Sequence, residues 1–151
     1  MDTELVEELR KTIDKLGSIN ELNEEDSKSL VDDLAVQYIA DRNLVWWWEG
    51  LLDKPVVINY GDSLGWDYIV KLVRSPDQNV YLVATDDNAE PWEVFEGSLA
   101  AVVMLLENMW RFEYIIVDVN LSWIIFDTHH NSLVVAGCLR EQAIELAAIE
   151  S

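Results

Sequence analysis

The chain has few cysteines, few basic residues and no long apolar run. Its 151 residues include one cysteine, Cys138, so no disulfide can form within the chain. The apolar residues 134–137 before it predict a buried, unreactive thiol. Apolar runs such as residues 99–106 are far shorter than the roughly 20 residues that span a bilayer. Charges also interrupt the first 16 residues, where a signal peptide would be apolar. We therefore expect a cytoplasmic protein with no membrane partner.

Basic residues are scarce relative to acidic ones. The chain has ten Lys and Arg and 29 Asp and Glu, which gives a net charge of −19. Nucleic acids and anionic membranes are bound through Lys and Arg, so this balance argues against both as partners. Two interpretations remain: acidity that serves solubility, or a surface complementary to a basic protein, whose association the charge would steer. Residues 1–41 are the most acidic part, with 12 acids against 4 bases.

Motifs that would name a reaction are absent from the sequence. Residues 61–65, GDSLG, match neither a P-loop nor a dinucleotide-binding fingerprint. Ser63 does not lie in a G-x-S-x-G nucleophile elbow. No His or Cys spacing typical of a zinc site occurs, and the acids lack the calcium-loop spacing. The sequence therefore predicts a protein that is not an enzyme and has no cofactor and no bound metal.

Four segments have the pattern of helices. An amphipathic helix is predicted over residues 3–16, ending at Gly17, because Leu residues recur at helical spacing. A second helix is predicted over residues 26–41, with Asp26 or Ser27 as its N-cap. An apolar helix is predicted over residues 97–109, with Ser98 as its N-cap, and a C-terminal helix over residues 139–150. Residues 1–41 thus form an acidic helical front end.

The remaining segments have the pattern of strands. Residues 112–137 are dense in β-branched and aromatic residues and predict a three-stranded meander in the middle of the core. Its strands are expected at residues 113–118, 123–127 and 133–136. Residues 55–60 predict another strand, and residues 68–74 and 80–85 a hairpin across 75–79. We expect one α+β domain over residues 1–151, in which residues 44–137 form a mostly antiparallel or mixed sheet of six or seven strands with helices on one side.

Three consecutive tryptophans, residues 46–48, are the most unusual local feature. In a strand, alternation would send Trp46 and Trp48 to one face and Trp47 to the other. They either cap the core beside the helical pair or leave an indole exposed as an interface anchor, since tryptophan is enriched at binding hot spots.

The two histidines are adjacent, at the end of a predicted strand. His129 and His130 converge only if the turn bends them together, because neighbouring strand residues point to opposite faces. Asp127 is the nearest carboxylate in sequence that could orient an imidazole acting as acid or base. A pocket formed by Asp127, His129 and His130 is one interpretation; histidines bonded to backbone or carboxylate at a strand end are the other.

A resemblance adds a functional expectation. Residues 112–137, with Leu121-Ser122-Trp123 and Thr128-His129-His130-Asn131, look like the C-terminal half of small acidic bacterial proteins, and residues 92–97 add to the likeness. These are uncharacterised families associated with immunity proteins of polymorphic toxin systems, including the SUKH group. The match covers roughly residues 90–137, while the residue 46–48 run departs from the SUKH pattern. The resemblance implies a cytosolic protein that neutralises a partner by binding.

The leading hypothesis is therefore an acidic immunity-type inhibitor of a basic toxin, such as a nuclease. Carboxylates would occupy the toxin's phosphate-binding sites, and exposed aromatics would be buried as anchors. The candidate contacts are Asp62, Asp67, Asp86, Asp87, Glu90, Trp47 and Trp66. Two alternatives remain: a small-molecule binder or enzyme that uses His129 or His130, and a structural protein that is a homodimer rather than a monomer through its surplus tryptophans.

Overall fold

The computed structural model describes residues 3–85 and 90–150 and shows one α+β domain. In this part of the chain, five α-helices surround a seven-stranded sheet. The helices are α1 (Glu4–Leu16), α2 (Glu24–Tyr38), α3 (Gly65–Val73), α4 (Leu99–Glu107) and α5 (Arg140–Glu150), and η1 (Trp47–Glu49) is a short 3-10 turn. The strands are β1 (Ile19–Glu21), β2 (Val56–Asn59), β3 (Asn79–Ala84), β4 (Val94–Ser98), β5 (Tyr114–Asp118), β6 (Trp123–Thr128) and β7 (Ser132–Gly137).

The sheet has the order β1-β4-β3-β5-β6-β7-β2, and every neighbouring pair is antiparallel. The predicted meander is confirmed as β5, β6 and β7, which lie inside the sheet. Every residue of β5 and β6 is buried. Their unbroken apolar character therefore reflects burial on both faces of the sheet.

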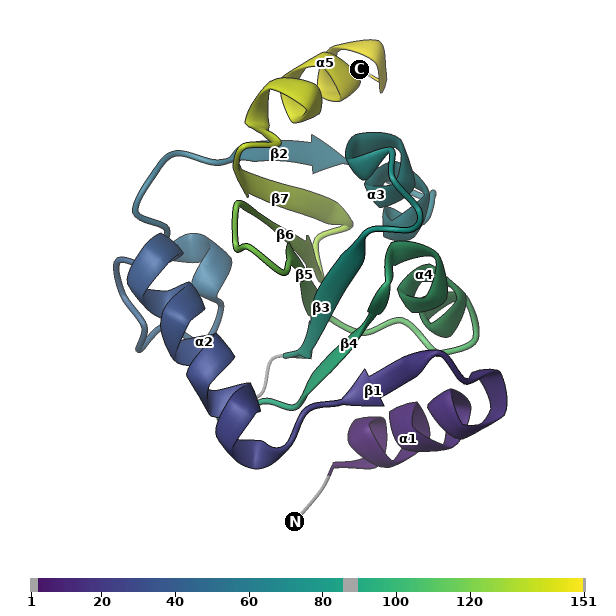
Figure 1. Cartoon of the computed structure of the whole chain (residues 1–151). Helices are drawn as coiled ribbons and strands as arrows, with labels where there is room; N and C mark the ends of the chain where they lie inside the picture. The colour runs from purple at the N-terminus through teal and green to yellow at the C-terminus, as the bar shows by residue number, and fades with distance from the viewer. Residues whose placement is uncertain (1–2, 86–89, 151) are drawn as a thin grey trace.

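Helices cover both faces of the sheet, so the expectation of helices on one side is wrong. Helices α1, α3, α4 and α5 pack on one face, and α2 with η1 packs on the other (Figure 1). Alternation along β5 and β6 supplies both cores: Ile116 and Ile125 belong to the first, and Ile115 and Ile124 to the second. Within the described residues, no helix is long and apolar enough to cross a membrane.

Side chains cap three helices at their N-termini. The Thr3 hydroxyl accepts a hydrogen bond from the Val6 backbone N–H at α1, and Ser98 caps α4 as predicted. The N-cap of α2 is Asn23, not Asp26 or Ser27, because the helix starts two residues earlier than predicted. Gly17 ends α1 with a φ of 74°, a left-handed value that glycine adopts without a Cβ clash.

The predicted strand at residues 68–74 is wrong: this segment is helix α3. Tyr68, Ile69 and Leu72 are buried while Val70 is exposed, which is a helical pattern of burial. The partner of β3 is instead β4, which was not predicted and whose last two residues lie in the predicted helix at residues 97–109. Strand β1 was also missed. It is three residues long, lies at the sheet edge and pairs with β4, so residues 1–41 contribute to the sheet as well as to the helical layers.

Candidate functional site

Polar residues collect where β3 and β6 end and β5 and β7 begin, a region called here the Asp127 end of the sheet. Cross-strand pairing places Ala84 opposite Tyr114, Tyr114 opposite Asp127, and Asp127 opposite Leu133. Strand β2 also ends here, because Asn59 pairs with Ser132. Side chains that are far apart in sequence therefore meet at this end.

Asp127 is the centre of a buried polar network. Its side chain is 2% exposed, and the Tyr60 hydroxyl donates a hydrogen bond to its Oδ1. Tyr60 Oη in turn accepts from the Arg111 guanidinium, whose Nη2 lies 3.5 Å from Asp127 Oδ1. Arg111 also donates to the Thr128 carbonyl at 2.6 Å and to Asn131 Oδ1. The network therefore ties β6 and the turn after it to the residues that follow β2 and precede β5.

Burial dominates the acid–base properties of this network. It raises the pKa of Asp127, while the hydrogen bonds from Tyr60 and Tyr114 and the charge of Arg111 partly oppose the rise. Burial also raises the pKa of Tyr60, and the hydrogen bond to Asp127 raises it further. The Tyr60 hydroxyl thus keeps its proton at neutral pH and acts as a donor to the carboxylate.

The first residue of α3 has to be glycine because of Asp127. A Cβ built on Gly65 would lie 2.2 Å from Asp127 Oδ2 and 2.9 Å from its Cγ. Gly65 is buried, and Asp127 is held by Tyr60 and Arg111, so neither can move aside cheaply. The close approach fixes the start of α3 against the Asp127 end.

The two histidines lie side by side beyond Asp127, on the tight turn between β6 and β7. Their ring centroids are 4.0 Å apart, so the turn does bring them together, with Asn131 at a φ of 57°. The carboxylate that orients His129 is Glu113, not Asp127: Glu113 Oε2 lies 3.1 Å from His129 Nδ1 and accepts from the His129 backbone N–H at 2.9 Å. Asp127 points instead toward Tyr60. In the described part of the chain, no group of three His, Cys, Asp or Glu could hold a metal ion.

Tryptophans from the loop after α2 cover the histidines. The Trp46 ring lies 4.8 Å from the His129 ring, and Trp48 lies 5.7 Å from the His130 ring, centroid to centroid. Trp47 points the other way and is buried in the second core, with its ring against Trp92 at 4.8 Å and its N–H donated to the Arg42 carbonyl. The run therefore matches the expected core cap and not the exposed anchor: Trp47 is buried, and Trp46 and Trp48 are half-buried over the Asp127 end.

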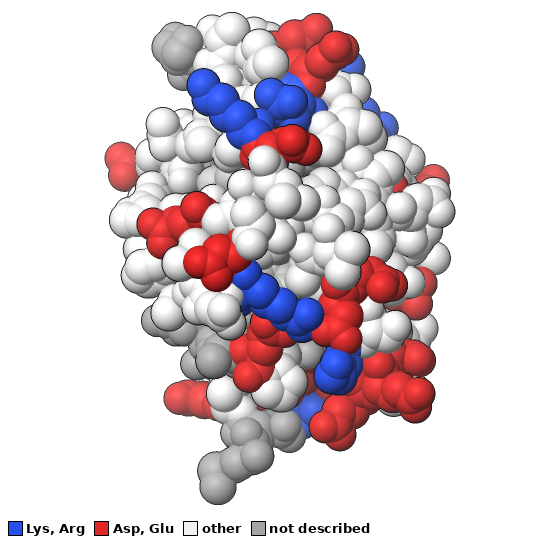
Figure 2. Space-filling view, turned by 90° about the vertical axis from the view of Figure 1, so that its left-hand side faces the viewer, with Lys and Arg blue, Asp and Glu red and all other residues white. Residues whose placement is uncertain are grey.

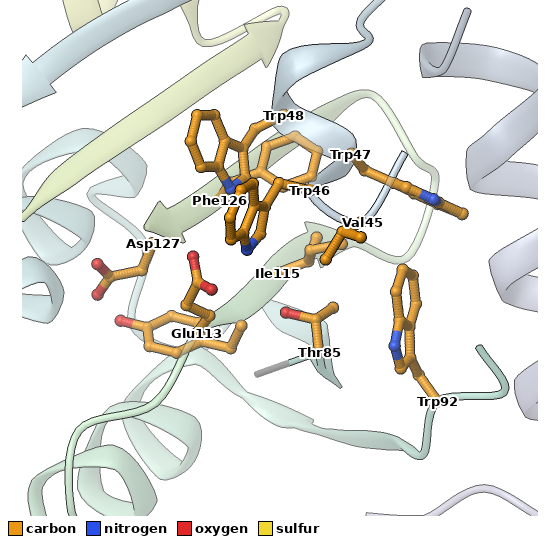
Figure 3. A pocket seen from close by; sticks show the side chains of 11 residues that line it. Val45, Trp46, Trp47, Trp48, Thr85, Trp92, Glu113, Ile115, Phe126 and Asp127 are labelled. Carbon is orange, nitrogen blue, oxygen red and sulfur yellow. The ribbon is translucent and has the colours of Figure 1, made fainter. Parts of the chain in front are cut away.

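A small cavity of about 20 Å³ lies under Trp46 (Figure 3). Apolar and aromatic side chains, including Trp92 and Phe126, form most of its wall. Its polar lining includes Glu113, Tyr114 and Asp127. A volume of this size accommodates a water molecule or a group of a few atoms, and is far smaller than a typical cofactor pocket.

Two polar atoms on the cavity wall, Trp46 Nε1 and Tyr114 Oη, differ in their surroundings. Trp46 Nε1 is buried with no hydrogen-bond partner. Tyr114 is 2% exposed, and burial, the nearby Asp127 charge and a hydrogen bond to Asp127 raise its pKa well above the usual value. Tyr114 Oη therefore keeps its proton at neutral pH and faces the Asp127 carboxylate, whereas the Trp46 N–H is left unsatisfied.

The predicted partner-binding residues are distributed unevenly. Asp62 and Asp67 are exposed, after β2 and in the first turn of α3, so both flank the Asp127 end. Glu90 is half-buried and paired with Arg42, with a distance of 3.0 Å from Arg42 Nε to Glu90 Oε2. Asp86 and Asp87 lie outside the described residues. Partner contact through these acids stays a prediction.

Three side-chain expectations are corrected or limited. Trp47 is 3% exposed, so it is a core residue and not an exposed anchor. Trp66 is half-buried against the core formed with α1, α3, α4 and α5, which restricts what it can offer to a partner. Cys138 is exposed, contrary to the expected buried thiol, because it lies just past the end of β7, where the chain turns toward α5.

The sequence reading missed most of the residues at the Asp127 end. Tyr60, Arg111, Glu113 and Tyr114 were read as ordinary parts of strands or their flanks. One signal was available: Arg111 is one of only ten basic residues and directly precedes the most apolar part of the chain. A lone base next to buried strands requires a partner, and the acid Asp127 at the end of a neighbouring strand supplies it.

The outer side of α2 and the loop after it, residues 24–53, is called here the α2 face. It carries eight acids and two bases, and both bases are paired with acids: Lys28 Nζ lies 2.8 Å from Asp32, and Arg42 pairs with Asp32 and with Glu90 from outside this segment. Large apolar side chains are exposed between these charges, namely Val36, Leu44, Val45 and Leu52. Figure 2 views the molecule from this side and shows an uncharged band across the middle, with acidic side chains and a few basic ones below it and a basic group above it.

Comparisons with known proteins place the chain in a family. The model of a family described as "Family of unknown function (DUF6756)" matches residues 2–147. Searches of curated proteins and of solved structures give no match. Since the family match spans almost the whole chain, the protein belongs to the DUF6756 family, whose function is unknown.

Proposed function

We propose that this protein is an acidic binding protein of the bacterial cytoplasm that neutralises a basic protein toxin, as immunity proteins do. The observation that carries the proposal is the α2 face, where exposed apolar side chains lie among acids that greatly outnumber the bases. Val36 and Val45 are 82% and 59% exposed there. Apolar surface bordered by charge of one sign is typical of a docking site for an oppositely charged protein.

The charge of the α2 face supports a basic partner in particular. Lys28 and Arg42 are both engaged by acids of the protein itself, so neither is available to attract an anionic partner. Hydrogen bonds from Lys28 and Arg42 hold the pKa of Asp32 below its usual value, which keeps this carboxylate charged. Asp33 and Glu49 are exposed on the same face. A nuclease toxin, whose own active region binds phosphate, would present the complementary charge.

The partner would gain affinity from the apolar side chains and association rate from the acids. Energetic hot spots in protein interfaces are desolvated side chains, while charges at the rim mainly steer the encounter. Leu52, 54% exposed, and Val45 are the most suitable anchors on this face because they flank the turn that the buried Trp47 fixes in the core. The histidines and the cavity have no required role in this mode of action.

The test is capture of a partner from the source cells on the immobilised protein, at about 0.15 M and about 1 M salt. Raising the salt shortens the Debye length from about 8 Å to about 3 Å and weakens steering by surface charge. We expect a basic protein to be retained at the lower salt, and its toxic activity to be inhibited by the wild-type chain.

The matched variants carry equal changes of charge at different places. Asp33→Lys with Glu49→Lys reverses two exposed acids of the α2 face, and Asp77→Lys with Glu107→Lys reverses two exposed acids outside it. The first pair should lose retention and inhibition; the second should keep both. Equal behaviour of the two pairs, or a retained protein whose activity is unaffected, would rule out this mode of action.

A further inference from the structure

The indole of Trp46 brings a buried hydrogen-bond donor to the small cavity at the Asp127 end. Trp46 Nε1 is buried and has no hydrogen-bond partner, and an indole N–H can only donate. Figure 3 shows its ring nitrogen pointing toward Glu113 and Thr85, which both line the cavity. A buried donor without an acceptor is costly, so a ligand that accepts from this N–H is favoured here.

Two side chains of the cavity wall can accept hydrogen bonds from such a ligand. The two contacts of Glu113 with His129 both go to Oε2, and a carboxylate accepts about four hydrogen bonds in all. The Thr85 hydroxyl is a further acceptor on the wall. Asp127 belongs instead to its own buried network, and Figure 3 shows its carboxylate turned away from Trp46.

The size and charge of the cavity select one ligand. A volume of about 20 Å³ has room for a single water molecule. A chloride ion would accept from the Trp46 N–H but would meet the negative charge of Glu113. A sodium or ammonium ion would suit that carboxylate but cannot accept from the N–H. Water is neutral and of the right size, and it both accepts and donates.

We propose that the cavity under Trp46 is the binding site of one ordered water molecule. The water accepts from Trp46 Nε1–H and donates to the Glu113 carboxylate and to the Thr85 hydroxyl oxygen. Three partners are the usual number for a buried water. The water therefore joins the loop after α2 to the residues that follow β3 and precede β5, and Glu113 continues the chain of hydrogen bonds to His129.

This water gives the loop after α2 a polar attachment to the sheet. On the other side of the loop, Trp47 is held by apolar contact with Trp92 in the second core. Val45, exposed on the α2 face, directly precedes Trp46, so the water supports this surface from below. The water site does not depend on docking at the α2 face, and either proposal can fail alone.

The test measures magnetisation transfer from water to the seven tryptophan indole N–H groups by water-selective NOE and ROE experiments with ¹⁵N detection. Signals are assigned through bonds in uniformly labelled protein, so the assignment needs no variant. We expect the Trp46 N–H to show water cross-peaks of opposite sign in the two experiments, which identifies a long-lived bound water. The exposed Trp110, outside the cavity lining, is the internal control and should lack them. Absence of such cross-peaks at Trp46 would overturn the proposal.

A hydroxyl proton that exchanges with water can imitate a bound water in this experiment. Tyr114 and Thr85 each carry a hydroxyl on the cavity wall, so Tyr114→Phe and Thr85→Val are the controls. The Trp46 cross-peaks should persist in Tyr114→Phe. They should weaken but remain in Thr85→Val, because two partners of the water are left. Complete loss in either folded variant would assign the signal to the hydroxyl and overturn the proposal.

Two substitutions of similar size test Glu113 as the acceptor. Glu113→Gln keeps an acceptor oxygen and should keep the Trp46 cross-peaks, whereas Glu113→Leu removes both oxygens and should abolish them. Cross-peaks that persist in both folded variants would refute this assignment. If Glu113→Leu does not fold, a crystal structure of the wild type decides instead. It should show a water peak about 2.7–3.2 Å from Trp46 Nε1 and from a Glu113 oxygen, and a cavity without that peak would overturn the proposal.

Discussion

Removing the Tyr60 hydroxyl should destabilise the protein, because this hydroxyl donates a hydrogen bond to the buried Asp127 carboxylate. In Tyr60→Phe the aromatic ring stays in the core, but Asp127 loses a donor and Arg111 loses an acceptor. Asp127 is 3% exposed, so water cannot take the place of the phenol. The change therefore leaves a buried carboxylate less well solvated, with no change in apolar packing.

The expected loss is about 2–4 kcal/mol of unfolding free energy at neutral pH. A hydrogen bond to a charged group is worth about 1.5–3 kcal/mol, and its removal adds part of the desolvation penalty of the remaining charge. Arg111 is half-exposed and still faces Asp127 at 3.5 Å, so part of the charge remains compensated. This places the loss below the roughly 5 kcal/mol of the most severe substitutions.

The loss should depend on pH in a defined direction. The Tyr60 hydrogen bond opposes the burial that raises the pKa of Asp127, so Tyr60→Phe lets that pKa rise further. The folded variant then binds the Asp127 proton more tightly than the folded wild type does. The difference in stability is therefore smallest in acid, where Asp127 is protonated in both proteins. It grows as the pH rises through the pKa of Asp127 in the folded wild type, which lies above the ordinary Asp value, and levels off above the still higher pKa in the variant.

The assay is urea unfolding followed by tryptophan fluorescence, at several pH values, with Tyr81→Phe as the matched control. Tyr81 is half-buried on β3, and its pKa is raised by burial and by the acids Glu96 and Asp26, not by Asp127. Tyr81→Phe should therefore cost little. A loss below about 1 kcal/mol in Tyr60→Phe, or equal losses in the two variants, would refute the assigned role of Tyr60.

Other predictions concern single positions. Gly65→Ala should destabilise by about 1–3 kcal/mol in urea unfolding, despite alanine's higher helix propensity, because its Cβ would meet Asp127 Oδ2; a stabilised variant would contradict that contact. Burial raises the pKa of Asp127, so wild-type stability should fall relative to Asp127→Asn as pH rises above about 3.9; parallel pH curves would show that the carboxyl is not perturbed. Ser98→Ala should cost about 1 kcal/mol by removing the cap of α4, measured by the same unfolding. Cys138 should react with a thiol reagent at the same rate in the folded and in the unfolded chain, since its side chain is exposed; strong protection in the folded state would contradict this.

Local patterns predicted the parts of the fold that depend on local physics. The meander at residues 112–137 was found because β-branched and aromatic residues recur there between turn residues. Helix α1 and the Ser98 cap followed from apolar spacing and from capping chemistry. These elements would be recognisable in any context, since their signals lie within a few residues of one another.

The elements that the sequence did not predict take their conformation from tertiary contacts. In α3, Tyr68 to Leu72 can be read as a strand or as a helix, and only packing against the first core selects the helix. Strand β1 is three residues long and gains its pairing from β4, far along the chain. Short apolar segments of this kind carry no periodicity long enough to identify them.

The site was harder to predict than the fold because its residues come from separate segments. Asp127 was singled out, but its partners Tyr60 and Arg111 lie 67 and 16 positions away along the chain, and only the sheet order brings them together. His129 was assigned the nearest acid in sequence, whereas pairing of β5 with β6 supplies Glu113 instead. Spacing along the chain does not contain this information.

The most direct test of the proposed function is an inhibition titration of the captured basic protein. Its toxic activity would be measured against increasing amounts of the wild-type chain and of the Asp33→Lys, Glu49→Lys variant. The account predicts that the wild type abolishes the activity at equimolar amounts and that the variant requires a large excess. Equal inhibition by both chains, or none by the wild type, would contradict docking through the α2 face.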